Sequence, residues 1–347
     1  MFYFRADANA NIGSGHVMRC LSIAQALLKK GYDSTFITAD HEAEQLIISR
    51  GFGVLCLNSI WCDLDTETDQ LTALIQQEDI RTLLIDSYYV TENYLSRLQQ
   101  YTRTIYLDDI NQFIYPVDVL INYNIYAERI PYRQSYKDKA TLLLLGCEYA
   151  PLRAEFTGRT PRQGKTVSDI LISTGGSDPY HMAGKLLEYL ILTGDFPAIR
   201  FHVVVGSFNT HRKLLMELAD RQKNIILHDQ VTEMSKLMEA CDLAITAGGS
   251  TLYELCACGI PAISYSFADN QLDGVQEFDR QNIIYYSGDI RVQEEECLRN
   301  IHERLCRLIS DHQLRGTISV RMQSLVDGLG AVRITEHLLQ NTEGKSC

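Results

Sequence analysis

Short apolar runs alternate with amphipathic stretches through the first half of the chain. Strands are expected at MFYFRAD, DSTFITA, GVLCLN, TLLIDSY, TIYLDD and DVLINYN, and helices at GHVMRCLSIAQALLKKG, EAEQLIISRG, DQLTALIQQE and ENYLSRLQQY. The expected strands are apolar nearly throughout, which is typical of parallel strands buried on both faces. In the helices, apolar residues recur every three or four positions and form one face. This alternation predicts a doubly wound α/β domain.

The second half repeats the pattern after a polar stretch at 156–169. Strands are expected at DILISTG, RFHVVVG, NIILHD, LAITAG and PAISYSF, and helices at HMAGKLLEYLILTG, THRKLLMELADRQ, EMSKLMEAC and STLYELCACG. Residues 294–341 are expected to be mostly helical. We therefore predict two Rossmann-like domains, at 1–156 and 169–341, with a linker at 157–168 and a tail at 342–347. Ligands of such sheets bind at the carboxyl ends of strands, and a cleft between the domains would extend that site.

Composition narrows the class of protein. The 347 residues suit about two domains, and a net charge of −12 argues against a general binder of nucleic acid or anionic membranes. The sequence contains no run of ~18 apolar residues, so we expect no integral membrane segment. The first residues lack the features of a signal peptide, so we expect a cytoplasmic protein.

The ten cysteines are best explained as buried thiols. The pairs Cys256/Cys258 and Cys56/Cys62 lack the C-x2-C spacing of a zinc site. We therefore expect neither a metal nor a cofactor.

The loop RADANANIGSGHVMRC follows the first expected strand. Gly13 and Gly15 would let the backbone approach a ligand, and the next helix offers free N–H groups to an anion. No Lys closes this loop as in a phosphate loop; His16 stands at the helix start instead. Arg5 and Asp7 precede it, and a carboxylate beside an imidazole can orient it and raise its basicity. A tight turn with a solvent-facing histidine is the structural alternative.

The loop STGGSDPYHMAG places Gly175 and Gly176 after another strand. Ser177 or Asp178 can cap the following helix, so this stretch is also explained as an ordinary helix start. His181 follows directly and stays a candidate because of that position.

The segment ITAGGSTLYELCACGIPAISYSFADNQ carries the most specific pattern. Two glycines, Gly248 and Gly249, lead into Ser250 and Thr251 at a helix start, which can supply N–H groups, hydroxyls and a positive helix end to a diphosphate. Glu254 lies one turn further, spaced to reach a ribose diol. Its alternative explanation is a solvated helix carboxylate.

These motifs together resemble a known family. The last segment is similar to the nucleotide-binding signature of GT-B enzymes related to the MurG transferase. The first loop resembles that of the UDP-sugar hydrolases of pseudaminic acid biosynthesis (PseG) and the related spore-coat polysaccharide proteins (SpsG). The stretches that carry the likeness follow the family's order: RADANANIGSGHVMRCLSIAQAL, LLIDSYYV, YLDDI, LLGCEYAPLRAEF, ISTGGSDP, TAGGSTLYELCACGIPAISYSFADNQ and DGLGAVRI.

The resemblance implies a GT-B architecture, with two Rossmann-like domains facing a central cleft. It also implies hydrolysis of UDP-2,4-diacetamido-2,4,6-trideoxy-β-L-altropyranose to UDP and free sugar, without a metal. By the same likeness His16 would be the general base, with Tyr88 and Asn270 positioning water or sugar. Because neighbours on an extended segment point opposite ways, either Tyr88 or Tyr89 would face the cleft.

Further residues are implied on the binding side of the site. The loop Gly248–Gly249–Ser250–Thr251 and Glu254 would hold UDP. The other expected substrate or nucleotide contacts come from the remaining motifs: Arg5, Asp7, Gly13, Gly15, Arg153, Gly175, Gly176 and Gln271.

The chemistry of the residues agrees with this. UDP is a good leaving group, so one base that activates water suffices where glycosidases use two carboxylates, and imidazole suits a base at neutral pH. A GT-B glycosyltransferase of surface polysaccharide synthesis is the alternative, and a non-catalytic UDP-sugar-binding protein is a third hypothesis. We expect a UDP-sugar as the partner, no nucleic acid, and a monomer or small homo-oligomer.

Overall fold

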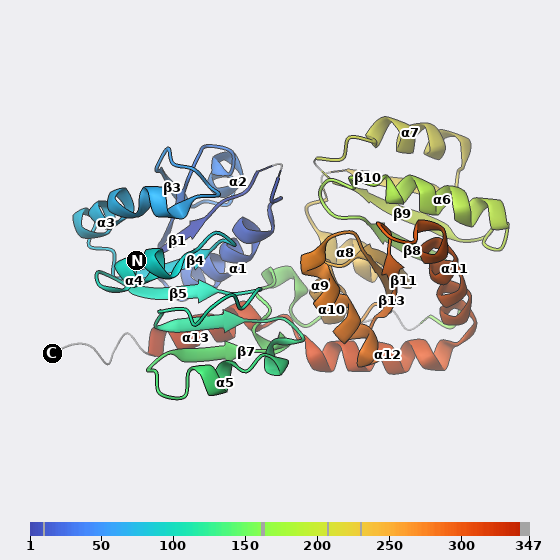
Figure 1. Ribbon diagram of the computed structural model, residues 1–347. Helices are drawn as coiled ribbons and strands as arrows, with labels where there is room; N and C mark the ends of the chain where they lie inside the picture. The colour runs from blue at the N-terminus through green and yellow to red at the C-terminus, as the bar shows by residue number, and fades with distance from the viewer. Residues whose placement is uncertain (10, 161–163, 207, 230, 341–347) are drawn as a thin grey trace. The chain divides into compact units, whose positions relative to one another are not determined.

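The computed structural model describes residues 1–9, 11–160, 164–206, 208–229 and 231–340 (Figure 1). The chain divides into two compact units. Unit 1 contains Met1–Ala154 and the described residues from Leu329 onward, and unit 2 is Glu155–Gly328. Each unit is built on one parallel sheet with helices, so the predicted class of two doubly wound, Rossmann-like domains is confirmed.

Unit 1 has a seven-stranded parallel sheet in the order β3-β2-β1-β4-β5-β6-β7. Its strands are β1 (Phe2–Ala6), β2 (Ser34–Thr38), β3 (Gly53–Cys56), β4 (Thr82–Asp86), β5 (Arg103–Leu107), β6 (Val119–Asn122) and β7 (Leu142–Leu145). Its helices are α1 (Gly15–Lys29), α2 (Glu44–Ile48), α3 (Thr68–Gln77), α4 (Glu92–Gln99), α5 (Tyr132–Ser135) and α13 (Gly330–Gln340). Every residue of β1 and β4 is buried, as the continuous apolar runs predict.

Unit 2 has a six-stranded parallel sheet in the order β10-β9-β8-β11-β12-β13. Its strands are β8 (Asp169–Ser173), β9 (Arg200–Val205), β10 (Ile225–Asp229), β11 (Leu243–Ala247), β12 (Ala262–Ser266) and β13 (Tyr285–Asp289). Its helices are α6 (Met182–Thr193), α7 (Arg212–Arg221), α8 (Met234–Glu239), α9 (Thr251–Cys258), α10 (Asp269–Arg280), α11 (Glu294–Ser310) and α12 (His312–Leu325).

The strand order reverses once in each sheet. The chain leaves β1 for β2 on one side and later returns to β4 on the other, and β8 has the same relation to β9 and β11. At such a switch point the loops that follow two neighbouring strands diverge and leave a crevice at their carboxyl ends. Each unit therefore has one position that favours a ligand, between β1 and β4 or between β8 and β11.

Among the described α-helices and strands, four were not predicted: β7, β13, α10 and the short helix α5. The strands β7 and β13 lie at sheet edges, and α10 begins at Asp269, where the sequence suggested only the end of a strand. Helix α10 is strongly polar, with its buried side chains spaced along one face at Val275 and Phe278. That spacing is a helical signal, but it is diluted by the polar residues between.

The C-terminal helix corrects the predicted domain division. Residues 330–340 were assigned to the second domain, yet α13 belongs to unit 1, where it packs on α1 (Figure 1). Arg103 of β5 donates from Nη1 to the carbonyl oxygen of Leu338 at 2.8 Å. The described part of the predicted linker at 157–168 clusters with unit 2. Residues 161–163 and the predicted tail at 342–347 lie outside the described residues.

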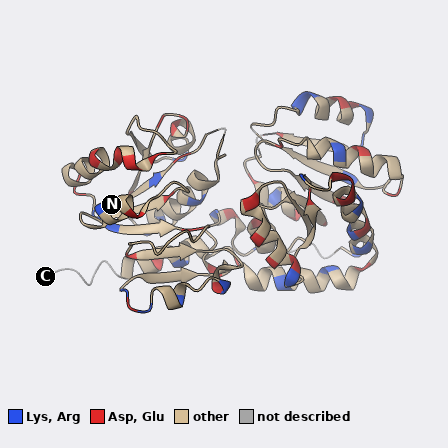
Figure 2. Cartoon of the chain, viewed as in Figure 1, with Lys and Arg blue, Asp and Glu red and all other residues tan. Residues whose placement is uncertain are grey.

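Charged side chains of both signs are interspersed over the helices of both units (Figure 2). Within the part of the chain that the structure describes, no helix combines the length and apolar character needed to cross a membrane.

Candidate active site

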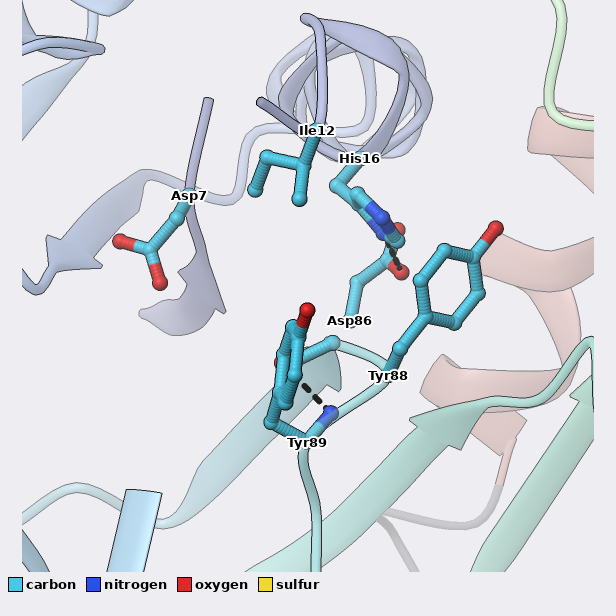
Figure 3. Close-up of a pocket in the computed structure, with 7 residues that line it drawn as sticks. Asp7, Ile12, His16, Asp86, Tyr88 and Tyr89 are labelled. Atoms are coloured by element: carbon cyan, nitrogen blue, oxygen red, sulfur yellow. Dashed lines mark hydrogen bonds and ion pairs between the residues drawn. The ribbon is translucent and has the colours of Figure 1, made fainter. Parts of the chain in front are cut away.

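A pocket lies at the switch point of unit 1, at the carboxyl ends of β1 and β4 (Figure 3). Two residues that line it, Asp7 and Ile12, come from the loop after β1, and His16 comes from the first turn of α1. The end of β4 and the segment after it supply the remaining lining residues: Asp86, Ser87, Tyr88 and Tyr89. The pocket therefore joins two of the motifs that the sequence singled out.

Local hydrogen bonds shape the loop before His16. The side-chain oxygen of Asn9 accepts from the backbone N–H groups of Asn11 and Ile12, at 2.9 and 3.1 Å. The N–H of Gly13 donates to the carbonyl oxygen of Asn9 at 2.8 Å. Gly13 has φ +70°, a left-handed conformation that glycine adopts without strain, whereas Gly15 begins α1 with ordinary helical geometry. Only Gly13 needs to be glycine for the shape of this turn.

His16 forms a dyad with Asp86. The imidazole is 5 % exposed, and its Nδ1 lies 2.6 Å from Oδ1 of Asp86. Because an ionised carboxylate only accepts, Nδ1–H is the donor, and the neutral ring keeps its lone pair on Nε2. Among the described residues none is bonded to Nε2. The dyad thus has the arrangement of a general base whose tautomer is fixed by a buried carboxylate.

The Asp86 carboxylate is held in its charged form. Burial raises the pKa of this carboxyl, but the positive charge of Arg19 and the bond from His16 outweigh burial and hold the pKa well below its usual range. Arg19 donates from Nε to Oδ2 and from Nη2 to Oδ1 of Asp86, both at 2.5 Å. This fork–fork geometry is the strongest arrangement of an arginine and a carboxylate.

Arg19 also reaches a second carboxylate. Its Nη1 lies 2.7 Å from Oδ2 of Asp109, which follows β5, and 2.9 Å from the hydroxyl oxygen of Tyr123, which follows β6. The pKa of Tyr123 is raised to about 12, mainly by burial, so this phenol stays protonated. One guanidinium therefore links Asp86, the last residue of β4, to residues that follow β5 and β6.

Tyr88 is the tyrosine that contacts His16. Its ring packs edge-to-face on the imidazole, with ring centroids 4.6 Å apart, and its hydroxyl donates to Oδ2 of Asp109 at 3.2 Å. Burial and the negative charge of Asp109 raise its pKa well above the usual range. Tyr89 points in a different direction (Figure 3), is 40 % exposed, and packs edge-to-face on Trp61. Both tyrosines line the pocket, but only Tyr88 is bonded into the His16 network.

Arg5 does not face the pocket, which corrects its expected contact with substrate. It is fully buried, and its guanidinium bonds Glu67 at 2.7 and 2.9 Å and Asp7 at 2.5 Å. The other oxygen of Asp7 accepts from the N–H of Ala39. Asp7 lines the pocket, but the carboxylate that orients His16 is Asp86, not Asp7 as the sequence suggested.

Sequence reasoning missed Arg19, Asp86 and Asp109 as site residues. Signals for them exist: His16 and Arg19 are three apart on one helix and so share a face. Asp86 ends β4 and Asp109 follows β5, and side chains at neighbouring carboxyl ends meet at one edge of a parallel sheet. The strand order that brings β4 beside β1 is what the sequence lacks.

In unit 2 the loop after β8 carries Gly175 and Gly176, both exposed. Gly175 has φ +84°. Asp178 caps α6, because its carboxylate accepts from the N–H groups of Met182 and Ala183 at 2.7 and 3.1 Å. His181, the residue before α6, packs its ring on that of His211 with centroids 4.6 Å apart. The helix-start explanation of this motif accounts for Asp178.

The two glycines after β11 differ in role. The N–H of Gly248 donates to the carbonyl oxygen of Tyr265, and a Cβ there would lie 2.4 Å from the Val275 side chain. Gly248 is therefore required for packing, and its N–H is engaged within the protein. Gly249 is exposed, and a Cβ there would meet nothing within 4 Å.

Helix α9 begins after Ser250, whose side chain makes no capping bond. Ser250 is exposed, Thr251 is half-buried, and Glu254 lies in the first turn of the helix. The N–H groups of Leu252 and Tyr253 donate to the carbonyl oxygens of Gly249 and Ser250, at 3.1 and 3.0 Å, so an anion at this helix start would meet the N–H groups of the residues before them.

The remaining candidates lie on three different segments. Asn270 is exposed on the first turn of α10. Gln271 accepts the N–H of Phe267 on its side-chain oxygen at 2.9 Å, which shapes the turn between β12 and α10. Arg153 is half-buried near the end of the first long segment of unit 1.

The nine described cysteines are all free thiols, and six of them are buried. Within the described ranges no three His, Cys, Asp or Glu side chains are grouped to hold a metal ion.

Known proteins resemble this chain over most of its length, although no protein-family model matches it. The spore coat polysaccharide biosynthesis protein SpsG of Bacillus subtilis is 24% identical over 339 residues, which are 95% of each chain. The UDP-2,4-diacetamido-2,4,6-trideoxy-beta-L-altropyranose hydrolase of Campylobacter jejuni is 26% identical over 267 residues, covering 76% of this chain and 90% of that one.

Among solved structures, MurG of Acinetobacter baumannii superimposes with a TM-score of 0.69 at 13% identity, covering 98% of this chain and 99% of that one. At this level of identity the likeness shows the fold alone. The chain is therefore similar in sequence to SpsG and to the Campylobacter hydrolase, and its fold is the GT-B fold of MurG.

Proposed function

We propose that this protein is an enzyme that hydrolyses a UDP-linked diacetamido-trideoxy hexose to UDP and the free sugar. The observation that carries the proposal is the His16–Asp86 dyad in the pocket of unit 1, with Nε2 left as the basic nitrogen. The likeness to a hydrolase named for UDP-2,4-diacetamido-2,4,6-trideoxy-beta-L-altropyranose supports this substrate, and hence a role in nonulosonate biosynthesis of the pseudaminic acid type.

In the proposed reaction Nε2 of His16 accepts a proton from water as the water oxygen bonds to the anomeric carbon. The bond from that carbon to the diphosphate oxygen breaks, and its electron pair leaves with UDP. The imidazolium that forms is stabilised by the charged Asp86 carboxylate behind it, at 2.6 Å. UDP needs no strong acid to leave, so the second carboxylate of ordinary glycosidases is unnecessary.

Tyr88 is assigned to positioning the water or the sugar, because its ring fixes one side of His16. Its phenol stays protonated, since burial and Asp109 raise its pKa, so it donates rather than acts as a base. Asp7 and Gly13 are assigned to the substrate side of the same pocket. Asn270 retains its proposed role at the sugar.

Nucleotide binding is assigned to unit 2. The loop from Gly248 to Thr251 would meet the diphosphate with the N–H groups of Gly249, Ser250 and Thr251 at the start of α9, and Gly249 would give the open approach. Glu254 would bind the ribose. Gly175 and Gly176 would contribute exposed backbone beside the same switch point. Helix N-termini rather than a metal ion would thus balance the charge of UDP.

The direct test is incubation of the purified protein with a panel of UDP-sugars, with and without EDTA, while UDP release is followed by phosphorus NMR. We expect release from a diacetamido-trideoxy UDP-sugar without any acceptor and without loss in EDTA. The variant His16→Ala serves as the negative control: it lacks the proposed base, so it should release no UDP while still binding it. Absence of release from every diacetamido-trideoxy substrate would contradict the proposal.

A GT-B glycosyltransferase is the second candidate, favoured by the likeness in fold to MurG. Transfer needs an acceptor hydroxyl in place of water, and the same base could deprotonate it. UDP release that depends strictly on an added acceptor would replace the hydrolase with this transferase.

A further inference from the structure

The structure assigns to Arg19 the part of a positioning residue that holds His16 and Tyr88 in one hydrogen-bonded network and sets a positive charge against protonation of the His16 imidazole. This inference rests on the proposed base role of His16. Arg19 itself lines no part of the pocket, so it would act only through its neighbours.

The first argument is geometric. All three kinds of guanidinium nitrogen are used: Nε and Nη2 bond Asp86, and Nη1 bonds Asp109. Asp86 holds Nδ1 of His16, and Asp109 accepts the hydroxyl of Tyr88. His16 and Tyr88, which both line the pocket, are therefore held in place through the same arginine. A lysine could replace the charge but not this fork, because an ammonium has no planar pair of donors.

The second argument is electrostatic. In a simple dyad the carboxylate stabilises the imidazolium, so it also favours a ring that is already protonated and unable to accept a proton. Here Nη2 of Arg19 lies 3.2 Å from Nδ1 of His16 and shares Oδ1 of Asp86 with it. This positive charge opposes protonation of the ring before the reaction, while Asp86 still fixes its tautomer.

The charged and titratable groups around His16 show what the removal of Arg19 would change. Arg19 contributes one positive charge, and Asp86 and Asp109 contribute two negative ones. Tyr88 and Tyr123 remain neutral, and Cys20, whose Sγ lies 3.7 Å from Asp86, remains a thiol because burial and Asp86 raise its pKa. Asp7, which follows β1, is paired with Arg5, which it shares with Glu67. Removing Arg19 leaves the ring facing two unbalanced carboxylates.

The test is the pH dependence of kcat/KM for three variants. We expect Arg19→Gln to move the acid limb upward by about one pH unit, since a charge within ~4–6 Å typically shifts a titration by 1–3 units. Asp109→Asn removes a negative charge and should move the limb downward. Arg19→Lys should leave the limb nearly in place yet lower kcat, because the charge stays and the fork is lost. Arg97→Gln, at an exposed pair with Asp69, is the matched control and should change neither.

An unshifted acid limb in both Arg19→Gln and Asp109→Asn would overturn the assignment, as would full kcat in Arg19→Lys. The titration of His16 in the free protein, followed by NMR, needs no substrate. If no UDP-sugar is hydrolysed, the same opposite shifts in that titration still support the role of Arg19, and their absence refutes it. The two proposals therefore fail separately. If Arg19→Gln does not fold, the direction in which Asp109→Asn shifts the His16 titration decides the question.

Discussion

At the scale of single residues, the site depends on which carboxylate stands behind His16. The sequence offers Asp7, nine residues away, but the structure uses Asp86, seventy residues away, and gives Asp7 to Arg5. Asp7 is therefore occupied in neutralising a buried guanidinium. The identity of the orienting residue was not predictable from sequence distance, since it follows from β4 lying beside β1.

We expect Asp86→Asn to lower kcat about 10²–10⁴-fold, the usual contribution of a general base, because the amide cannot fix the imidazole tautomer or balance the imidazolium. UDP affinity should stay nearly unchanged, since nucleotide binding is assigned to unit 2. Asp69→Asn, at an exposed carboxylate, is the control. Steady-state kinetics and UDP titration by calorimetry measure both quantities. Near-normal turnover in Asp86→Asn would remove the dyad from the mechanism.

Asp86 also links stability to acid. Its pKa is lowered in the folded chain, so its contribution is fully present above the unfolded value of ~3.9 and is lost as pH falls toward the folded value. The free energy of unfolding of the unmodified chain should therefore exceed that of Asp86→Asn at pH 7, and the gap should narrow below about pH 4. Urea unfolding across this range measures it. A gap that widened on acidification would contradict the charged state of Asp86.

At the scale of elements, two glycines near the start of α1 look equivalent in the sequence but have different backbone conformations. Gly13 has a left-handed φ, and Gly15 does not. Gly13→Ala should cost about 1–2 kcal/mol of stability and reduce activity, because alanine is strained in the left-handed conformation of the turn that positions the start of α1 and His16. Gly15→Ala should be close to neutral in stability, since a Cβ there meets nothing within 4 Å. Thermal unfolding and kcat distinguish them; equal losses would contradict this account of the turn.

The start of α13 gives a second matched pair. A Cβ on Gly330 would lie 2.1 Å from the carbonyl oxygen of Ala150, whereas one on the exposed Gly316 of α12 would meet nothing within 4 Å. Gly330→Ala should cost about 1–3 kcal/mol through overpacking against backbone. Gly316→Ala should gain up to about 1 kcal/mol from helix propensity. Urea unfolding of both variants checks this, and a neutral Gly330→Ala would show that α13 docks differently.

The alternation of apolar runs predicted most strands and helices of both sheets, because buried parallel strands and amphipathic helices have distinct periods. It did not place α13, since an amphipathic helix carries no mark of the sheet that it will cover. The candidate site was predictable at His16 and Tyr88, which stand in recognisable motifs. Arg19 and Asp109 were not predictable, because they occupy ordinary helix and strand-end positions. Only the strand order shows that these positions lie beside His16.

At the scale of the whole molecule, the assignment of nucleotide to unit 2 and base to unit 1 predicts a localised response to UDP. Saturating UDP should slow amide hydrogen exchange at residues 248–254 and 175–178 and leave α1 unchanged. Hydrogen–deuterium exchange with mass spectrometry measures this, and Glu254→Ala should need more UDP for the same protection. Protection confined to unit 1 would reverse the assignment.

The route of the chain has a consequence for biosynthesis. Unit 2 is one continuous stretch, but unit 1 needs α13, which the ribosome makes after all of unit 2. Domains that are synthesised first ordinarily fold first. Here synthesis of unit 1 begins before that of unit 2 but is completed after it. Until α13 emerges, the face of α1 that it covers stays open to chaperones. A message cut short after codon 328 would thus yield a protein with an intact unit 2 and an incomplete support for the helix that carries His16.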